Sequence, residues 1–330
     1  MRNILSACLV AGSLVTLLLS GCGQAAATAD TAVNPKQEMV TLAAELRHYS
    51  RQRQPSFQLV GNGAAGLLEV TPDNPPEVAA LLVHSLDGFL TESVFYTEKD
   101  GQDQLQAADT AAYLQEILAI PLAADKAVWT LDYVREQALQ QEDEALGKKA
   151  GYVSMAVGNK NLDRLPKGKV PHVNSRDIET VQEAKNFLFL LNPEHFASRE
   201  AYLAALRNTP YDVLVLDLEA NDGTLTAADV ASLKENPQGG RRLVLCYLSV
   251  GEAATYRPYW QQEWQRQRPD WIAEANTAWP GSYRVRYWRP EWKHILYGSP
   301  DAYLDRIMAS GFDGAFLDVM DGWQSFLPPE

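Results

Sequence analysis

The stretch Gly311-Phe312-Asp313-Gly314-Ala315-Phe316-Leu317-Asp318-Val319-Met320-Asp321 decides the fold. Apolar residues fill both of its faces from Phe312 to Val319, which is typical of a parallel strand that is covered on both sides. The run ends in carboxylates, at the point where a barrel strand meets its active-site loop. Asp318 is therefore the first catalytic candidate, although an aspartate at a strand end also caps turns.

The same arrangement of an apolar run, a polar residue at its end and an amphipathic segment recurs along the chain. The apolar runs predict eight strands, at 57–61, 88–95, 127–133, 151–157, 186–191, 212–218, 242–249 and 312–319. The amphipathic segments predict helices at 36–52, 76–85, 107–119, 135–148, 176–185, 198–207, 226–235 and 300–310. Eight such units in one domain, residues 35–330, favour a closed (β/α)8 TIM barrel over an open sheet.

Polar residues gather at the carboxyl ends of these strands, as an active site on the top face of a barrel requires. They are Asn62, Glu92, Asp132, Asn192, Asp217, Glu219, Ser249, Glu252 and Asp318. The stretch Gly61 to Gly66 also matches a dinucleotide fingerprint. That motif needs a long helix at its third glycine, however, and the prolines that follow at 72, 75 and 76 interrupt it.

The connection from Gly251 to Pro300 is much longer than a normal crossover and holds six of the eight tryptophans. Trp260 and Trp264 have helical spacing, which favours packing. Trp279 and Trp288 lie in loop-like stretches, and aromatic rings above a barrel mouth suit the C–H faces of sugars. We therefore take these two as candidates for binding substrate.

The first residues form a separate region. Arg2 is followed by an apolar run and then by Leu19-Ser20-Gly21-Cys22, which resembles the signal peptide and lipobox of bacterial lipoproteins. The resemblance implies a signal peptide at 1–21, lipidation of Cys22, and a tether at 22–34 that anchors the domain to a membrane. Because Gly23 and not Asp follows the cysteine, we expect the outer membrane. A transmembrane segment is the alternative, but the run is short.

Composition narrows the possible partners. The net charge of −13 argues against nucleic acid as a partner and suits a cationic ligand. The alternative is that the acidic surface only keeps the protein soluble. Cys8 would be removed with the signal peptide and Cys22 would be lipidated, so Cys246 would be the one free cysteine of the mature protein. We therefore expect no disulfide. The five histidines are scattered, so we expect neither a metal nor a cofactor.

Four motifs together resemble glycoside hydrolase family 114, and they come in the family's order. The first three are Tyr247-Leu248-Ser249-Val250-Gly251-Glu252-Ala253, Tyr256-Arg257-Pro258-Tyr259-Trp260 and Arg286-Tyr287-Trp288-Arg289-Pro290-Glu291-Trp292. The fourth is the stretch from Gly311 to Asp321. These endo-α-1,4-polygalactosaminidases are (β/α)8 enzymes that cleave galactosamine-containing polysaccharides. The resemblance runs from about Phe187 to Asp321.

In that family, the strand similar to 312–318 is followed by a helix, a strand with an Asn-Gly-like end, and a strand that carries a glutamate. Here the matching parts stand at the front, as helix 36–52, the stretch containing Asn62, and Asp87 to Glu92. The stretch 129–133 with Asp132 follows them. We therefore infer a circular permutation, in which the strands at 57–61 and 312–319 become neighbours.

The resemblance also implies roles for individual residues. The catalytic aspartate of the family corresponds to Asp318 and its catalytic glutamate to Glu92, but the sequence leaves open which is the acid and which the nucleophile. A substrate-binding role follows for Asn62, Asp132, Asp217, Tyr247, Glu252 and Arg257. A salt-bridge network at the strand ends is the alternative for Asp217, Tyr247, Glu252 and Arg257.

The expected function is hydrolysis of an exported amino-sugar polymer by a lipid-anchored glycoside hydrolase. One alternative is a non-catalytic lipoprotein that binds carbohydrate or assists polysaccharide assembly. Another is a barrel hydrolase of different specificity, because the fold by itself implies no substrate.

Overall fold

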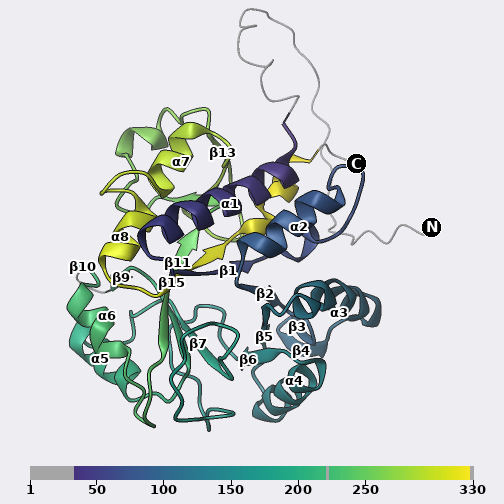
Figure 1. The fold of residues 1–330 in the computed structure, drawn as a ribbon, viewed down its shortest axis with the longest axis vertical. Helices are drawn as coiled ribbons and strands as arrows, with labels where there is room; N and C mark the ends of the chain where they lie inside the picture. Colours follow the sequence, from purple (N-terminus) through teal and green to yellow (C-terminus); the bar gives the residue numbers. More distant parts are fainter. Residues whose placement is uncertain (1–32, 221–222, 328–330) are drawn as a thin grey trace, which may run out of the picture. The chain divides into compact units, whose positions relative to one another are not determined.

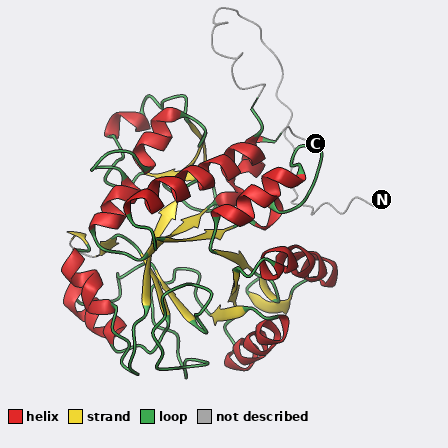
Figure 2. Cartoon of the chain, in the orientation of Figure 1, coloured by secondary structure: helices red, strands yellow, loops and turns green. Residues whose placement is uncertain are grey.

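Eight parallel strands form one sheet that is nearly closed into a barrel, and helices cover its outer face (Figure 1, Figure 2). The computed structural model describes residues 33–220 and 223–327. The order of the strands around the sheet is β6-β5-β2-β1-β15-β11-β8-β7. Their bounds are β1 Gln58–Asn62, β2 Gly88–Glu92, β5 Ala127–Tyr133, β6 Val153–Val157, β7 Phe187–Leu190, β8 Val213–Leu216, β11 Leu243–Ser249 and β15 Gly314–Asp318. All eight predicted strands are present, and the (β/α)8 class is confirmed.

Seven of the eight predicted helices are also present. The first, α1, begins after Asn34, whose side chain accepts a hydrogen bond from the backbone of Gln37, with Pro35 in the first turn. Its apolar residues Met39, Leu42 and Leu46 are fully buried. The helices are α1 Pro35–Arg53, α2 Pro76–Ser85, α3 Ala108–Ala123, α4 Gln137–Ala150, α5 Arg199–Arg207, α6 Ala227–Leu233, α7 Pro290–Leu296 and α8 Tyr303–Ala309.

The strand that contains Asp318 lies at the centre of the sheet. β15 pairs in parallel with β1 on one side and with β11 on the other. A Cβ atom at Gly314 would lie 2.3 Å from the carbonyl oxygen of Gln58 and 2.8 Å from the Leu245 side chain. Only glycine therefore lets the three strands approach here. The predicted adjacency of the strands at 57–61 and 312–319 is confirmed.

No hydrogen-bonded ladder joins the two edge strands, β6 and β7, among the described residues. The predicted helix at 176–185 is also absent, so this part of the prediction is wrong. The backbone N–H of Val181 donates to Gln58 and that of Lys185 donates to Asp212, and Gln182 donates to the carbonyl of Asp87. These tertiary hydrogen bonds replace helical ones, so an irregular segment crosses the amino-terminal ends of the strands.

Several smaller elements were not predicted. The expected strand at 88–95 ends at Glu92, and a hairpin of β3 (Tyr96–Lys99) and β4 (Gln102–Leu105) follows it. The long aromatic connection contains a three-stranded antiparallel sheet of β12 (Glu252–Ala254), β14 (Ser282–Val285) and β13 (Ile272–Ala275). The remaining elements are β9 Glu219–Ala220, β10 Gly223–Thr224 and the 3₁₀ helices η1 Ala65–Leu67, η2 Gln262–Gln265 and η3 Met320–Phe326.

The start of α1 packs beside η3, the segment that follows β15. The ammonium of Lys36 lies 4.8 Å from the ring centroid of Trp323, and the Tyr287 hydroxyl donates to the carbonyl of Pro35 at 2.7 Å. The described chain therefore enters the barrel beside the segment with which it ends. The predicted signal peptide, Cys22 and most of the tether lie outside the described residues. None of the helices within 33–220 and 223–327 is long and apolar enough to cross a membrane.

Candidate active site

The carboxylate of Asp318 points into the mouth of the barrel. Side chains two residues apart on a strand share a face, so Asp318 lies on the same face as Phe316. Phe316 makes an edge-to-face contact with Phe189 of β7 inside the barrel, with ring centroids 4.6 Å apart. Register then brings Asn62, at the end of β1, to the level of Asp318, because Gly61 pairs with Leu317. Glu92 ends the next strand, β2.

Asn62 joins the two candidate catalytic carboxylates. Its Nδ2 donates to Oε1 of Glu92 and to Oδ1 of Asp318, both at 2.8 Å. Since the two oxygens bind one nitrogen atom, they lie no further apart than twice that distance. The structure thus brings together Asp318, Asn62 and Glu92, the three residues expected from the sequence to lie on consecutive strands.

Two tyrosines hold the outer sides of this carboxylate pair. Tyr247, on β11, donates from its hydroxyl to Oδ2 of Asp318 at 2.7 Å. Tyr133, at the end of β5, hydrogen-bonds Glu92. Glu92 is exposed to the open cavity, but the surrounding protein partly removes water from its carboxyl group, and this desolvation raises its pKa. The negative charge of Asp318 adds to this effect, while the hydrogen bonds from Asn62 and Tyr133 oppose it. The net effect raises the pKa of Glu92, which favours its protonated form.

The backbone turns sharply after each carboxylate. Ser93, directly after Glu92, has a φ of 55°, and Val319, directly after Asp318, has a φ of 61°. This left-handed conformation is uncommon outside glycine and is strained for a β-branched residue such as Val319. Both acids thus stand at the last position of a strand, just before the chain turns away from the cavity.

These groups line one cavity of about 700 Å³ at the barrel mouth. Asn62, Glu92, Asp217, Tyr247, Glu252, Arg257, Trp279 and Asp318 all line it, as predicted. Tyr113 and Lys160 line it as well. The cavity is large enough for sugar units of a polymer, and its charged groups are mainly carboxylates.

Glu252 is held in the cavity by the small antiparallel sheet. Its Oε1 forms an ion pair with Arg284 at 2.7 Å and accepts a hydrogen bond from Asn276 at 2.7 Å. Burial raises the pKa of Glu252, and the charges of Asp318 and Asp321 add to this. The Arg284 charge and the Asn276 hydrogen bond lower it. Glu252 is thus a fixed, paired carboxylate beside the catalytic pair.

Asp217 and Arg257 form a bidentate ion pair. Nη1 and Nη2 of Arg257 each lie 2.6 Å from an oxygen of Asp217, and Nη1 also donates to the Tyr303 hydroxyl at 2.7 Å. Both side chains are mostly buried. The strand-end salt-bridge network considered from the sequence therefore exists for this pair, in the wall of the cavity.

Asp132 has a structural position and not the substrate-binding one expected from the sequence. It is fully buried, and its oxygens accept hydrogen bonds from the backbone N–H groups of Val94, Phe95 and Tyr96. It therefore fixes the turn after β2. Successive residues of a strand face opposite sides, so its neighbour Tyr133 lines the cavity instead.

The two candidate tryptophans have different environments. Trp279 lies in the connection between β13 and β14, lines the cavity and is 54% exposed, so its ring is open to a ligand. Trp288 is half-buried and packs edge-to-face on Tyr287 and Phe326, away from the cavity lining. The expected substrate contact of Trp288 is therefore not supported. Trp260 and Trp264 pack on each other, as their spacing indicated.

Some residues that line the cavity were not predicted from the sequence. Strand alternation from Leu131 would have identified Tyr133, because residues 131 and 133 share a face. Asp321 and Trp323 lie in η3, Arg284 lies in β14 and Asn276 directly follows β13, and no barrel periodicity applies to these segments. Within the described part of the chain, no three His, Cys, Asp or Glu side chains are grouped to hold a metal.

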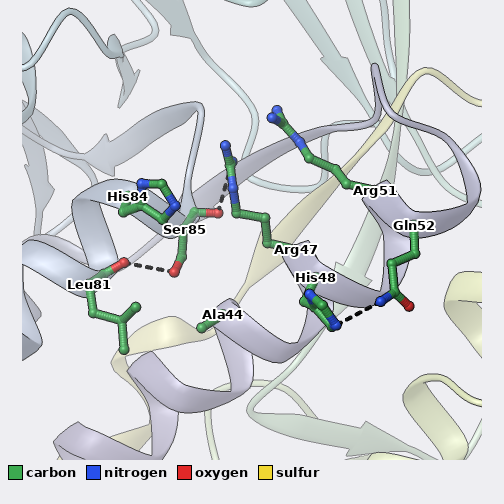
Figure 3. Close-up of a pocket in the computed structure, with 8 residues that line it drawn as sticks. All are labelled: Ala44, Arg47, His48, Arg51, Gln52, Leu81, His84 and Ser85. Carbon is green, nitrogen blue, oxygen red and sulfur yellow. Dashed lines mark hydrogen bonds between the residues drawn. The ribbon is translucent and has the colours of Figure 1, made fainter.

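A second, shallower groove lies on the outside of the barrel between α1 and α2 (Figure 3). Its basic side chains are Arg47, His48, Arg51 and His84. Both arginines bind Oδ1 of the buried Asp87, at 3.1 and 2.8 Å, and the other oxygen of Asp87 accepts the backbone N–H of Leu59. These arginines fasten α1 to the amino-terminal end of the sheet.

Comparison with known proteins agrees with this site. Residues 180–328, which include Asp217, Tyr247, Glu252 and Asp318, match the model of glycoside-hydrolase family GH114. The resemblance to this family is thereby confirmed for that part of the chain. Asn62 and Glu92 lie outside it.

Curated relatives match over shorter segments. An uncharacterized protein of Deinococcus radiodurans is 38% identical over 122 residues, 37% of each chain. One of Methanocaldococcus jannaschii is 30% identical over 164 residues, 50% of this chain and 45% of the relative. One of Thermotoga maritima is 41% identical over 80 residues, 24% of each chain. The chain thus spans less than half the length of each of these three relatives.

A search of solved structures finds a crystal structure of Aspergillus fumigatus Ega3 in complex with galactosamine. The identity is 18%, the TM-score is 0.28, and the match covers 49% of this chain and 51% of the other.

Proposed function

We propose that this protein is a glycoside hydrolase that cleaves an α-1,4-linked galactosamine-containing polysaccharide with Glu92 and Asp318. One observation carries the proposal: two carboxylates at the ends of neighbouring barrel strands are bridged by the amide of Asn62 at 2.8 Å each. Cleavage of a glycosidic bond needs such a pair, one group to donate a proton and one to attack or to activate water.

The environments of the two groups suggest their roles. Glu92, whose pKa desolvation raises, is the proton donor to the glycosidic oxygen. Asp318, held by hydrogen bonds on both oxygens, attacks the anomeric carbon as the leaving-group bond breaks. Water, which loses a proton to Glu92, then releases the sugar from Asp318. Their close spacing suits retention of configuration, because retaining enzymes hold these groups about 5–5.5 Å apart.

The substrate proposal rests on the family match and on the cavity. The matched family is one of glycoside hydrolases. The cavity is lined by Glu69, Glu92, Asp217, Glu252, Asp318 and Asp321, against the cations Lys160, Arg257 and Arg284. An excess of carboxylates favours a polymer with free amino groups. Trp279 offers an exposed ring for a sugar face.

Mutation of the two acids tests the proposal. Asp318→Asn and Glu92→Gln should each lower the rate of release of reducing ends from an α-1,4-galactosamine polymer by about 10²- to 10⁴-fold. Both side chains stand at strand ends, so the thermal unfolding temperature should change little. Proton NMR of the first product should show the α-anomer, as retention requires.

Glu252→Gln provides the comparison within the same cavity. Because Glu252 is paired with Arg284, we expect weaker substrate binding with turnover retained. Loss of activity in Glu252→Gln together with full activity in Glu92→Gln would show that Glu252, and not Glu92, transfers the proton. Binding of the polymer without any cleavage by the wild-type protein would favour a non-catalytic carbohydrate-binding protein.

We also propose that the chain is a circular permutation of the family's barrel. The pairing of β1 with β15, and the contact between Lys36 and Trp323, support this order. A strand-by-strand superposition on the crystal structure of a family member tests it. Such a superposition should match β1 and β2 to the two strands that follow the Asp318-like strand, and a match in the linear order would contradict the proposal.

A further inference from the structure

Asp321 is a carboxylate of the cavity that the proposed mechanism does not use. It lies in η3, three residues after Asp318, and lines the same cavity. Gly63 (φ +75°) leaves room for it at the end of β1, since a Cβ atom there would lie 3.1 Å from Cβ and Cγ of Asp321. The side chain is thus held over the carboxyl end of β1, next to the strand of Asp318.

The other cavity carboxylates have protein partners. Asp217 is paired with Arg257, Glu252 with Arg284, and Asp318 and Glu92 share the amide of Asn62. Asp321 differs, because within residues 33–220 and 223–327 no cation forms an ion pair with it and no other side chain donates a hydrogen bond to it. In the described part of the chain, its own backbone N–H is its one hydrogen-bonding partner.

Asp321 is half-buried in the cavity wall, and a carboxylate that is partly withdrawn from water without a partner is unfavourable. For Asp321, burial raises the pKa, the negative charge of Asp318 raises it further, and the positive charge of Arg284 opposes them. A cationic group that enters the cavity would remove this penalty and form a charge-assisted hydrogen bond.

We propose that Asp321 binds the ammonium group of an amino-sugar residue in the cavity, and so selects free-amine over N-acetylated units of the polymer. This inference rests on the proposed function. In this inference, a residue outside the catalytic pair distinguishes the free-amine form of the sugar from its N-acetylated form. An N-acetyl group has no charge to offer Asp321, so it leaves the carboxylate unpaired.

Asp321 has a second possible effect, which the test must separate from binding. Its negative charge also raises the pKa of Glu92. Loss of that charge would shift the pH profile of hydrolysis equally for every substrate. A specificity role instead affects only substrates that carry an ammonium group.

The experiment measures binding in a protein that does not turn over. Calorimetry with Glu92→Gln would compare an α-1,4-galactosamine oligomer with the same oligomer after N-acetylation. Adding Asp321→Asn should weaken binding of the free-amine oligomer by about 10- to 100-fold, the usual range for one hydrogen bond to a charged group. Binding of the N-acetylated oligomer should stay within about twofold.

A pH series on the parent protein gives a second measurement, in which Asp321 is protonated and not replaced. The Kd of the free-amine oligomer should rise as pH falls through the raised pKa of Asp321, because the protonated acid cannot pair with an ammonium group. Asp318, Glu252 and Arg284 also face this region, so their charges act on the same ammonium group. The same series with Asp321→Asn isolates the contribution of Asp321, because this variant should lose the part of the pH dependence that comes from that residue.

Asp125→Asn is the matched control. This exposed aspartate lies before β5, at the end of the barrel opposite the cavity, and should change neither affinity. Equal weakening of both oligomers by Asp321→Asn, or no weakening of either, would overturn the inference while hydrolysis by the wild-type protein still supports the proposed function. If the wild-type protein neither binds nor cleaves either oligomer, both proposals fall.

Discussion

At the scale of single residues, the catalytic pair depends on neutral side chains that hold charged ones. Asn62 donates from one nitrogen to two carboxylates, and Tyr247 and Tyr133 hold their outer sides. Each hydrogen bond to the charged form of Glu92 lowers its pKa, whereas desolvation and the Asp318 charge raise it. The pKa of Glu92 thus depends on a balance of opposing effects.

Removing one of these hydrogen bonds should shift the pH profile of hydrolysis. A general acid is active only while protonated, so activity falls as pH rises through the pKa of Glu92. Tyr133→Phe removes a hydrogen bond that lowers this pKa, so the alkaline limb of kcat/KM should move to higher pH. The measurement is kcat/KM from about pH 4 to pH 9.

Tyr297→Phe is the control for this shift. It removes a tyrosine hydroxyl that donates to Glu45 at 2.9 Å on the outside of the barrel, so the profile should not move. A profile that shifts to lower pH in Tyr133→Phe would show that Glu92 does not act as the acid.

At the scale of elements, α4 packs against the barrel beside a pair of buried carboxyl groups. Asp143 and Gly147 lie four residues apart on the buried face of α4. A Cβ atom at Gly147 would lie 1.7 Å from Oγ of Ser154, so the helix and β6 are in close contact there. Burial raises the pKa of Asp143, and the negative charge of the buried Asp132 raises the value further.

This pair should make the stability of the fold depend on pH. Because the folded pKa of Asp143 is raised, the folded state binds more protons than the unfolded state between the ordinary value of 3.8 and the raised one. Stability should therefore fall as pH rises through this window. Asp143→Asn is neutral at every pH, so its unfolding midpoint should fall less between pH 5 and about pH 9.

Denaturant unfolding at the two ends of that range gives the comparison. Glu116→Gln, an exposed change on α3, should leave the slope of stability against pH as in the wild type. An identical slope in the wild type and in Asp143→Asn would exclude the carboxyl pair as its source.

At the scale of the whole molecule, we propose that Cys22 carries a lipid that anchors the barrel, most simply at the outer membrane. The sequence Leu19-Ser20-Gly21-Cys22 supports this proposal. Cys22→Ser should then move the protein from the membrane fraction to the soluble fraction on centrifugation. Flotation of purified outer-membrane vesicles would test the location, and unchanged partitioning of the variant would contradict lipidation.

The sequence alone determined the alternation of strands and helices, because buried parallel strands read as apolar runs with polar ends. It also determined the catalytic candidates, since Asp318 and Glu92 are the last residues of their strands. The adjacency of β1 and β15 followed from the order of the motifs. The alternation repeats locally, so a pattern in the chain is sufficient to find it, whereas the role of Glu92 and the adjacency of β1 and β15 were inferred from the resemblance to a family.

Only the tertiary structure decided which way each strand-end side chain points and what it contacts. A shift of one residue reverses the face of a strand, so Asp132 lies in the core while Tyr133 reaches Glu92. The residues of segment 176–185 are compatible with a helix. Hydrogen bonds to distant residues, such as that from Val181 to Gln58, nevertheless take the place of helical hydrogen bonds. Asp321 joins the site through the turn at Val319 and the space left by Gly63, which depend on contacts far apart in the sequence.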